Sequence, residues 1–70
     1  MDKITIDTEF IKLDSLLKFC GWVDSGAIAK LLIKDGLVKV NGEVEYRRGK
    51  KIYPGDQIEY DNEKVIVDKS

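Results

Sequence analysis

The residues with the clearest chemical potential in this chain are basic, and many of them are close together in the sequence. From Lys39 to Lys51 there are five basic and two acidic residues, a local charge of +3 in a chain whose net charge is −1. Ammonium and guanidinium groups at this density bind phosphates, and a guanidinium can do so through two parallel hydrogen bonds. The same segment also fits a simpler interpretation, a solvated loop that keeps a sheet edge from aggregating.

These cations come from a predicted helix, a predicted strand and the loop that follows it. Lys30 and Lys34 are four residues apart, so they fall on one flank of the helix. The strand and loop contribute Lys39, Arg47, Arg48, Lys50 and Lys51. If the helix leads directly into the sheet, the helix flank, the strand and the loop border one concave surface. We therefore expect the cations to gather on one side of the molecule, opposite a mainly anionic back.

The composition argues against an enzyme. The chain has no His and one Cys, which excludes His-based triads, His-liganded metals, internal disulfides and thiolate clusters. No Asp or Glu pair shows an acid–base or metal-binding pattern. Cys20 continues an apolar helical stripe and is predicted to be a buried, inert thiol. We expect no catalytic residue, no metal and no cofactor.

Seventy residues at 8.0 kDa predict a single domain, residues 1–70, with a small core and no deep cavity. The first ten residues lack the basic start and apolar stretch of a signal peptide, and no run reaches the ~18 apolar residues of a membrane span. We expect a cytoplasmic monomer without a membrane partner.

The first half of the chain predicts a strand and a helix. Residues 3–6 alternate as a short strand does. Leu13, Leu16, Leu17 and Cys20 follow the spacing of one helix face, and Gly21 suits the position just after a helix end. A helix that begins near residue 8, with residue 10 on the same face, is the alternative.

A second helix is predicted after Asp24 and Ser25, both of which have side-chain oxygens suited to an N-cap. Its predicted buried stripe consists of Ala27, Ile28, Leu31 and Leu32. Gly36 ends this helix in the same way that residue 21 ends the first. Two short helices joined by a tight connection form a helical hairpin.

Beyond residue 36 the apolar period changes to two, which is typical of strands. Asn41-Gly42 predicts a type I′ hairpin turn, Pro54-Gly55 a type II turn, and Asp61-Asn62 a second hairpin turn. The predicted architecture is α+β, a two-helix hairpin packed on a small, mainly antiparallel sheet. Four aromatic residues could stack on bases: Trp22, Tyr46, Tyr53 and Tyr60. Trp22 is predicted to lie in the core or at its rim, and Tyr46, beside the basic loop, is the better candidate for stacking.

The chain resembles the S4 RNA-binding domain, also called the alpha-L motif, over about residues 12–60. The resemblance is carried by Lys12-Leu13-Asp14, by Val23-Asp24-Ser25, by the run from Ala29 to Gly42 (AKLLIKDGLVKVNG) and by Pro54-Gly55-Asp56. The sequence VKVNGEVE followed by RRGKK is most similar to small bacterial members implicated in ribosome maturation. The resemblance implies two helices followed by a small sheet, in agreement with the prediction from the residues.

The resemblance also implies which residues contact RNA. Lys12 occupies the basic position at the start of the first helix, and Ser25 the start of the second, where free N–H groups favour a phosphate. The remaining positions that match are Lys30, Lys34, Lys39, Asn41 and Gly42. Many members have Arg directly after the serine, where this chain has Gly26. Arg47, Arg48, Lys50 and Lys51 would compensate and shift the binding centre toward the loop.

The predicted function is non-catalytic binding of structured RNA, either ribosomal RNA or a ribosomal subunit or its precursor. A ubiquitin-like protein-interaction module is the alternative, but carriers of that type need a Gly-Gly terminus, whereas this sequence ends in VDKS. A helix-turn-helix DNA-binding domain is a third candidate. Its recognition helix would read GAIAKLLIK, which has few side chains that read bases.

Overall fold

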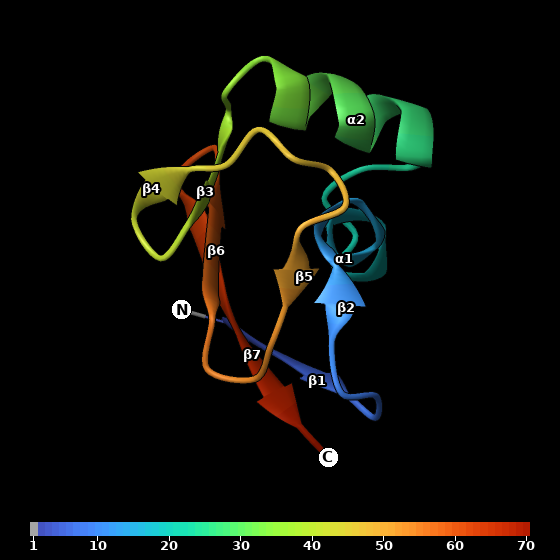
Figure 1. The fold of residues 1–70 in the computed structure, drawn as a ribbon, viewed down its shortest axis with the longest axis vertical. Helices are drawn as coiled ribbons and strands as arrows, with labels where there is room; N and C mark the ends of the chain where they lie inside the picture. The colour runs from blue at the N-terminus through green and yellow to red at the C-terminus, as the bar shows by residue number, and fades with distance from the viewer. Residues whose placement is uncertain (1) are drawn as a thin grey trace.

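The computed structural model describes residues 2–70, which form a five-stranded sheet, a separate two-stranded ribbon and two helices (Figure 1). In chain order the elements are β1 (Asp2–Ile6), β2 (Ile11–Lys12), α1 (Leu13–Phe19), α2 (Gly26–Lys34), β3 (Val38–Val40), β4 (Glu43–Val44), β5 (Lys51–Ile52), β6 (Gln57–Tyr60) and β7 (Glu63–Lys69). The predicted α+β architecture is confirmed. No helix within residues 2–70 has the length and hydropathy to cross a bilayer.

The large sheet has the strand order β1-β7-β6-β3-β4. The pairs β7–β6, β6–β3 and β3–β4 are antiparallel, as predicted, whereas β1 pairs with β7 in parallel, with Ile4 opposite Val67. This parallel pair joins the first strand of the chain to the last. The ribbon is formed by β2 and β5, which run antiparallel in front of the large sheet in Figure 1.

The predicted turns are present with the expected backbone geometry. Asn41 and Gly42 have φ of 53° and 88°, and Asp61 and Asn62 have φ of 50° and 66°. Positive φ at both central residues is the signature of a type I′ turn, whose twist matches that of the flanking strands. Gly55, at φ 99°, occupies the position of the type II turn at which a side chain would be strained.

Helix α1 packs its predicted stripe into the core. Leu13, Leu16 and Leu17 are fully buried, and the chain leaves the helix through Gly21 at φ 81°. The alternative start near residue 8 is wrong, because the residues before the helix form β2. Cys20 lies just after the helix and is half-buried rather than buried. Burial still raises the pKa of its thiol above the ordinary value, so the thiol is protonated at neutral pH.

The predicted stripe of α2 is wrong in phase. Ala29 and Ile33 are the buried residues, whereas Ile28 and Leu31 are exposed, and Leu31 retains 59% of its accessible surface. Ala27 is exposed as well, and Leu32 is half-buried. Six of the seven residues from 27 to 33 are apolar, so periodicity alone cannot determine which face packs against α1. The observed face places a small residue, Ala29, where the helix meets the core.

One apolar core lies between the helices, the ribbon and the inner face of the large sheet. Its largest fully buried side chains are Leu13, Leu16, Leu17, Ile33, Val38, Ile52, Ile58 and Val67. As predicted, Trp22 lies at the rim of this core, where it is partly buried. Its ring lies 5.9 Å from that of Tyr60. Strand β3, for example, contributes Val38 and Val40 to this core, so Lys39 between them points outward.

Candidate nucleic-acid interface

The ribbon places two lysines directly opposite each other. Lys12 of β2 pairs with Lys51 of β5, and the next residue, Leu13, donates its N–H to the Lys50 carbonyl at 2.9 Å. This pattern makes Lys12 and Lys51 a non-hydrogen-bonded pair, the type in which facing side chains are closest. Like charges in that position destabilise a sheet. Within residues 2–70 neither ammonium has a carboxylate within 4.0 Å, so the pair is free to bind an anion.

Backbone hydrogen bonds fix the basic loop to the start of α1. Lys12 occupies the N-cap position of α1, but its side chain makes no cap hydrogen bond. Instead, the N–H groups of Leu13 and Asp14 donate to the carbonyls of Lys50 and Arg48, at 2.9 and 3.0 Å. The loop thereby satisfies donors that the helix leaves unpaired. Its position relative to Lys12 is set by the fold and not by its charged side chains.

The cations of the loop differ in their availability. Arg47 binds Glu45 through two hydrogen bonds, Nε to Oε2 at 2.9 Å and Nη2 to Oε1 at 3.2 Å. The hydrogen bonds from Arg47 hold the pKa of Glu45 below its usual value, and the carboxylate in turn occupies the donors of the Arg47 guanidinium. Arg48 is exposed, Lys50 is half-buried, and neither has an ion-pair partner within residues 2–70. We call Lys12, Arg48, Lys50 and Lys51 the ribbon cluster.

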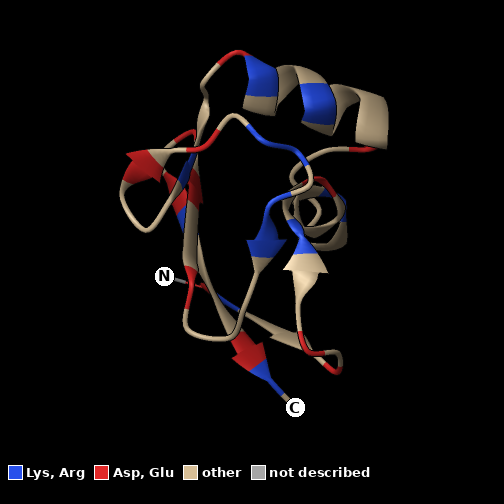
Figure 2. Ribbon diagram, viewed as in Figure 1, with Lys and Arg blue, Asp and Glu red and all other residues tan. Residues whose placement is uncertain are grey.

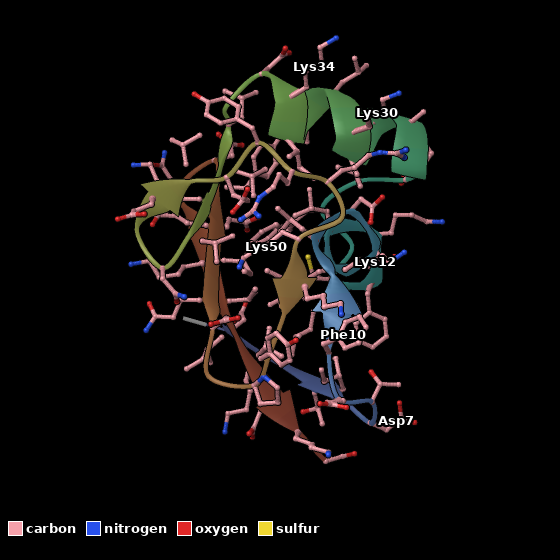
Figure 3. The ribbon with its side chains drawn as sticks, in the orientation of Figure 1. Asp7, Phe10, Lys12, Lys30, Lys34 and Lys50 are labelled. Carbon is pink, nitrogen blue, oxygen red and sulfur yellow. The ribbon has the colours of Figure 1, made fainter. Side chains whose placement is uncertain are left out.

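Two aromatic residues, Phe10 and Tyr53, lie beside the ribbon cluster. Tyr53 was among the residues predicted to be able to stack on bases, whereas Phe10 was not. The Nζ of Lys51 lies 4.8 Å from the centre of the Phe10 ring, and the Phe10 and Tyr53 rings are 5.9 Å apart. Figure 3 shows Phe10 below Lys12 on the same side of the molecule. Phe10 immediately precedes β2 and Tyr53 immediately follows β5, so the ribbon pairing that joins Lys12 to Lys51 also joins these rings.

A shallow pocket lies along the loop beside these residues. It has a volume of about 540 Å³ and is lined by Arg47, Gly49, Lys50, Lys51 and Tyr53. By contrast, Tyr46, the predicted stacking residue, lies against the end of α2. A Cβ on Gly36 would be 3.2 Å from the Tyr46 ring, although 65% of Tyr46 remains exposed.

Helix α2 presents Lys30 and Lys34 on its outer flank. Both are exposed, and in Figure 3 they project away from the loop of residues 47–50. Ser25 caps the helix, since its Oγ accepts the Ile28 N–H at 3.3 Å. The helix therefore offers a second basic area, separate from the ribbon cluster. A Cβ on Gly26 would meet no atom within 4 Å, so the backbone here leaves room for the start of a side chain.

The structure does not bring Lys39 and Asn41 to the ribbon cluster. Lys39 lies on the outer face of the large sheet, opposite Glu59 of β6. Asn41 is bound internally: its Nδ2 donates to Asp56 Oδ1 at 3.0 Å, and its Oδ1 accepts the Gln57 N–H at 2.9 Å. Asn41 thus joins the β3–β4 turn to the β5–β6 turn. Gly42 shares the first of these turns, with open space around it.

Figure 2 shows how these charges are distributed over the fold. Basic residues follow one another along α2, the loop and the ribbon, while β4 and several turns are acidic. On the large sheet two cations are paired, Lys3 with Asp68 at 3.7 Å and Lys64 with Glu59 at 3.9 Å. Of the cations expected on one side of the molecule, those of the ribbon cluster lie together. The α2 lysines are next to this cluster, and Lys39 lies apart from it.

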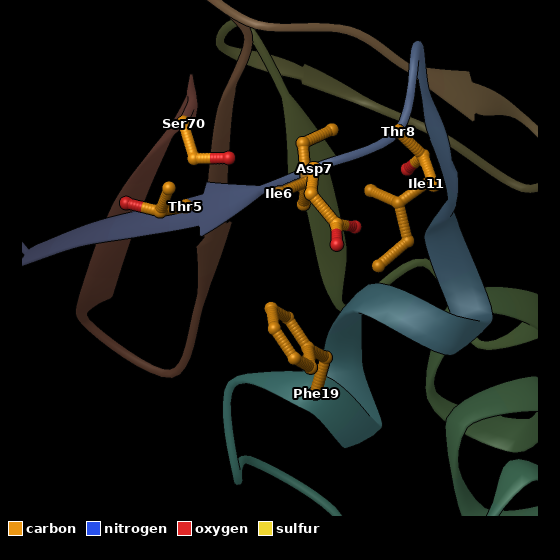
Figure 4. A pocket seen from close by; sticks show the side chains of 7 residues that line it. All are labelled: Thr5, Ile6, Asp7, Thr8, Ile11, Phe19 and Ser70. Carbon is orange, nitrogen blue, oxygen red and sulfur yellow. The ribbon is translucent and has the colours of Figure 1, made fainter.

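A second pocket of about 390 Å³ lies between the end of β1 and α1 and has a different character (Figure 4). Its lining includes Ile6, Ile11 and Phe19, and its one charged side chain is Asp7. Its lining offers no basic side chain to an anionic polymer. Within residues 2–70 there is also no group of three or more Cys, Asp or Glu side chains arranged to hold a metal ion.

The sequence matches the S4 domain family over residues 4–68. It is 45% identical over 56 residues to the "Probable ribosome maturation protein RlbA" of Bacillus subtilis (strain 168), covering 80% of this chain and 79% of that protein. It is also 44% identical over 57 residues to YbcJ of Escherichia coli (strain K12), covering 81% of each.

Two solved structures have the same fold. The solution structure of E. coli YbcJ, described as revealing an "ALFAL motif involved in RNA-binding", has a TM-score of 0.74 at 38% identity, covering 97% of this chain and 87% of that one. The trimeric structure of Vibrio cholerae heat shock protein 15 has a TM-score of 0.76 at 23% identity, covering 89% of this chain and 66% of that one. At that lower identity the likeness concerns the fold alone.

Proposed function

Because this chain belongs to the S4 domain family, we propose that it is a non-catalytic RNA-binding protein that recognises structured RNA through the ribbon cluster. The observation that carries this proposal is the Lys12–Lys51 pair, two basic residues opposite each other on the ribbon with no ion-pair partner within residues 2–70. A phosphate between them turns an unfavourable pair into a favourable site. Arg48 and Lys50 supply further donors from a loop that the fold holds in place.

The RNA is ribosomal RNA or a ribosome assembly intermediate, and the protein acts as a cytoplasmic monomer. Support for the class of RNA comes from the name of the B. subtilis relative, and support for RNA binding from the description of the YbcJ structure. Recognition uses shape and backbone charge, because the deep groove of A-form RNA hides the base edges from side chains. Lys30 and Lys34 form a second contact area beside the ribbon cluster.

The other predicted contacts have less support from the geometry. Arg47 is already bound to Glu45, Lys39 lies on the far face of the large sheet, and the amide of Asn41 holds the two turns together. Ser25 uses its hydroxyl in the helix cap. These positions, with Gly42, stay predictions of the sequence.

A matched pair of double variants tests the proposal. Lys12→Gln with Lys51→Gln removes two cations of the ribbon cluster, and Lys3→Gln with Lys64→Gln removes two from the large sheet, at the same net charge. Fluorescence anisotropy with a labelled RNA hairpin is expected to show a loss of about 1–3 kcal/mol for the first pair and little for the second. Equal losses in both would contradict the assignment of the surface.

The class of RNA needs a separate experiment in cells. Ultraviolet crosslinking of the tagged protein, followed by sequencing of the attached RNA, is expected to recover ribosomal RNA. Sucrose-gradient sedimentation at low and high salt then distinguishes free protein from protein bound to ribosomal particles, and light scattering of the purified protein checks the monomer. Recovery of mostly messenger RNA would contradict the ribosomal part of the proposal.

A further inference from the structure

The function proposed above uses the charges of the ribbon but leaves its aromatic residues unexplained. Phe10 and Tyr53 flank β2 and β5, next to the two facing lysines. Phe10 is half-buried, whereas Tyr53 keeps 43% of its surface exposed. The exposed part of Tyr53 lines a pocket that is also lined by three basic residues, Arg47, Lys50 and Lys51.

The two rings play different parts. Phe10 is half-buried and already occupied, because the Lys51 ammonium lies over its face at 4.8 Å and Tyr53 packs against it at 5.9 Å with the ring planes 47° apart. Phe10 therefore supports its neighbours. Tyr53 is the ring that lines the pocket, and Gly49, also in the lining, leaves the pocket open because a Cβ there would meet no atom within 4 Å.

The backbone of Tyr53 is fixed before any ligand arrives. Its N–H donates to Asp56 Oδ2 at 2.8 Å, and its carbonyl accepts the Asp56 N–H at 3.0 Å. The other carboxylate oxygen of Asp56 accepts from the Asn41 amide at 3.0 Å. A surface ordered in this way costs little further entropy when it binds a ligand.

We propose that this pocket takes one unpaired nucleobase of RNA, stacked on Tyr53, while Lys12 and Lys51 hold a neighbouring backbone phosphate. The proposal rests on the function proposed above and names its substrate class: duplex RNA with a bulged or single-stranded nucleotide beside the helix. Bases inside a duplex are covered by their neighbours, so only an unpaired base can offer its face to an aromatic side chain. The surrounding cations favour a nucleotide over a neutral aromatic ligand.

Two labelled RNA hairpins test this inference, identical except for one unpaired adenosine beside the stem of the second. The wild-type protein is expected to bind the bulged hairpin about five- to a hundredfold more tightly, the range that stacking of one base supplies. Tyr53→Leu is expected to abolish this preference and keep the affinity for the plain hairpin. Tyr53→Phe retains the ring and therefore the preference.

Tyr46→Leu is the matched control, because Tyr46 is more exposed than Tyr53 but lies outside the pocket. It is expected to leave the preference unchanged. As a direct readout, 2-aminopurine in place of the bulged adenosine is expected to lose fluorescence on binding wild type and to stay bright with Tyr53→Leu. Circular dichroism of each variant checks that it is folded.

Each outcome separates this inference from the proposed function. Equal binding of the two hairpins by wild type overturns the base pocket and leaves RNA binding intact. Tyr53→Leu weakening both hairpins by the same factor overturns it as well, since the residue then acts only through the fold. Absence of binding to either hairpin at low salt overturns the proposed function itself.

Discussion

Lys12 and Lys51 form a pair that lowers the stability of the fold and favours the binding of an anion. The two lysines are opposite each other across the ribbon, and within residues 2–70 neither ammonium has a carboxylate within 4.0 Å. Both residues were predicted to contact RNA, but 38 intervening residues hide their pairing in the sequence. Strand pairing between distant segments is set by the whole fold, so sequence alone identifies the residues and not the site that they form.

Lys12→Gln is expected to have opposite effects on stability and on binding. Removing one of two facing like charges should raise the free energy of unfolding by about 0.2–1 kcal/mol, measured by urea denaturation. The same change should weaken RNA binding. Lys64→Gln, which breaks the pair with Glu59, is the control and should not stabilise the protein. A Lys12 variant that loses both stability and binding would argue against a strained pair.

Arg47 was predicted to contact RNA, and its neighbour Glu45 explains why it is less available. The hydrogen bonds from Arg47 lower the pKa of Glu45 in the folded protein. This contribution to stability is therefore complete above the unfolded carboxyl pKa of about 4.3 and is lost as the pH falls through the lower folded value. Glu45→Gln should lower stability at pH 7 slightly, and the difference from wild type should vanish in acid.

The same Glu45→Gln variant should bind RNA more tightly at pH 7, because it frees the Arg47 guanidinium for phosphate. Anisotropy with a labelled hairpin measures this, and Glu43→Gln is the control, since Glu43 lines the same side of the hairpin without an ion pair within residues 2–70. Equal gains in the two variants would mean that net charge, and not the release of Arg47, is responsible.

Gly26 tests whether the α2 flank can take part in binding. Gly26 is the first residue of α2 and four residues before Lys30, with room for a side chain. Gly26→Arg should increase RNA affinity through a third cation on this flank. Its effect on the free energy of unfolding should be small, because the better helix propensity of Arg is offset by a cation at the N-terminus of the helix. Gly26→Ala separates the two effects, because it should stabilise the helix without tightening RNA binding.

At the scale of elements, turn chemistry was predictable and helix phase was not. The turns at residues 41–42, 54–55 and 61–62 follow from local backbone requirements, since Asn, Asp and Gly tolerate positive φ. The buried face of α2 depends on contacts with α1, and a helix that is apolar nearly all round gives no signal for it. The parallel pairing of β1 with β7 likewise depends on contacts between segments that are far apart in the sequence.

Asp56 connects the β3–β4 turn with the β5–β6 turn, so its role is to hold two elements together. Its carboxylate accepts hydrogen bonds from the Asn41 amide and the Tyr53 N–H. Asp56→Ala leaves both donors without this partner and should cost about 0.5–1.5 kcal/mol for each hydrogen bond lost. Thermal unfolding followed by circular dichroism should show a lower Tm, whereas Asp7→Ala, at another exposed turn, should change it little. A Tm equal to that of wild type would show that the turns are held by the strands alone.

At the scale of the whole molecule, a chain of net charge −1 binds a polyanion only if its cations are separated from its acids. The large sheet pairs Lys3 and Lys64 with carboxylates, while the ribbon cluster has no acidic partners within residues 2–70. The local excess of positive charge in residues 39–51 is visible in the sequence. The ion pair that occupies Arg47, and the pairing that brings Lys12 next to Lys51, depend on the folded structure.

The salt dependence of RNA binding tests this separation of charge. Each phosphate neutralised releases counterions, so about four contacts from the ribbon cluster should make log K fall with log salt at a slope of roughly −3 to −4. Lys12→Gln should reduce the size of the slope by about 1, because one contact is lost. Tyr53→Leu should leave the slope unchanged, since stacking releases no counterions. A slope near zero would contradict binding through phosphates, and an unaltered slope in Lys12→Gln would remove Lys12 from the interface.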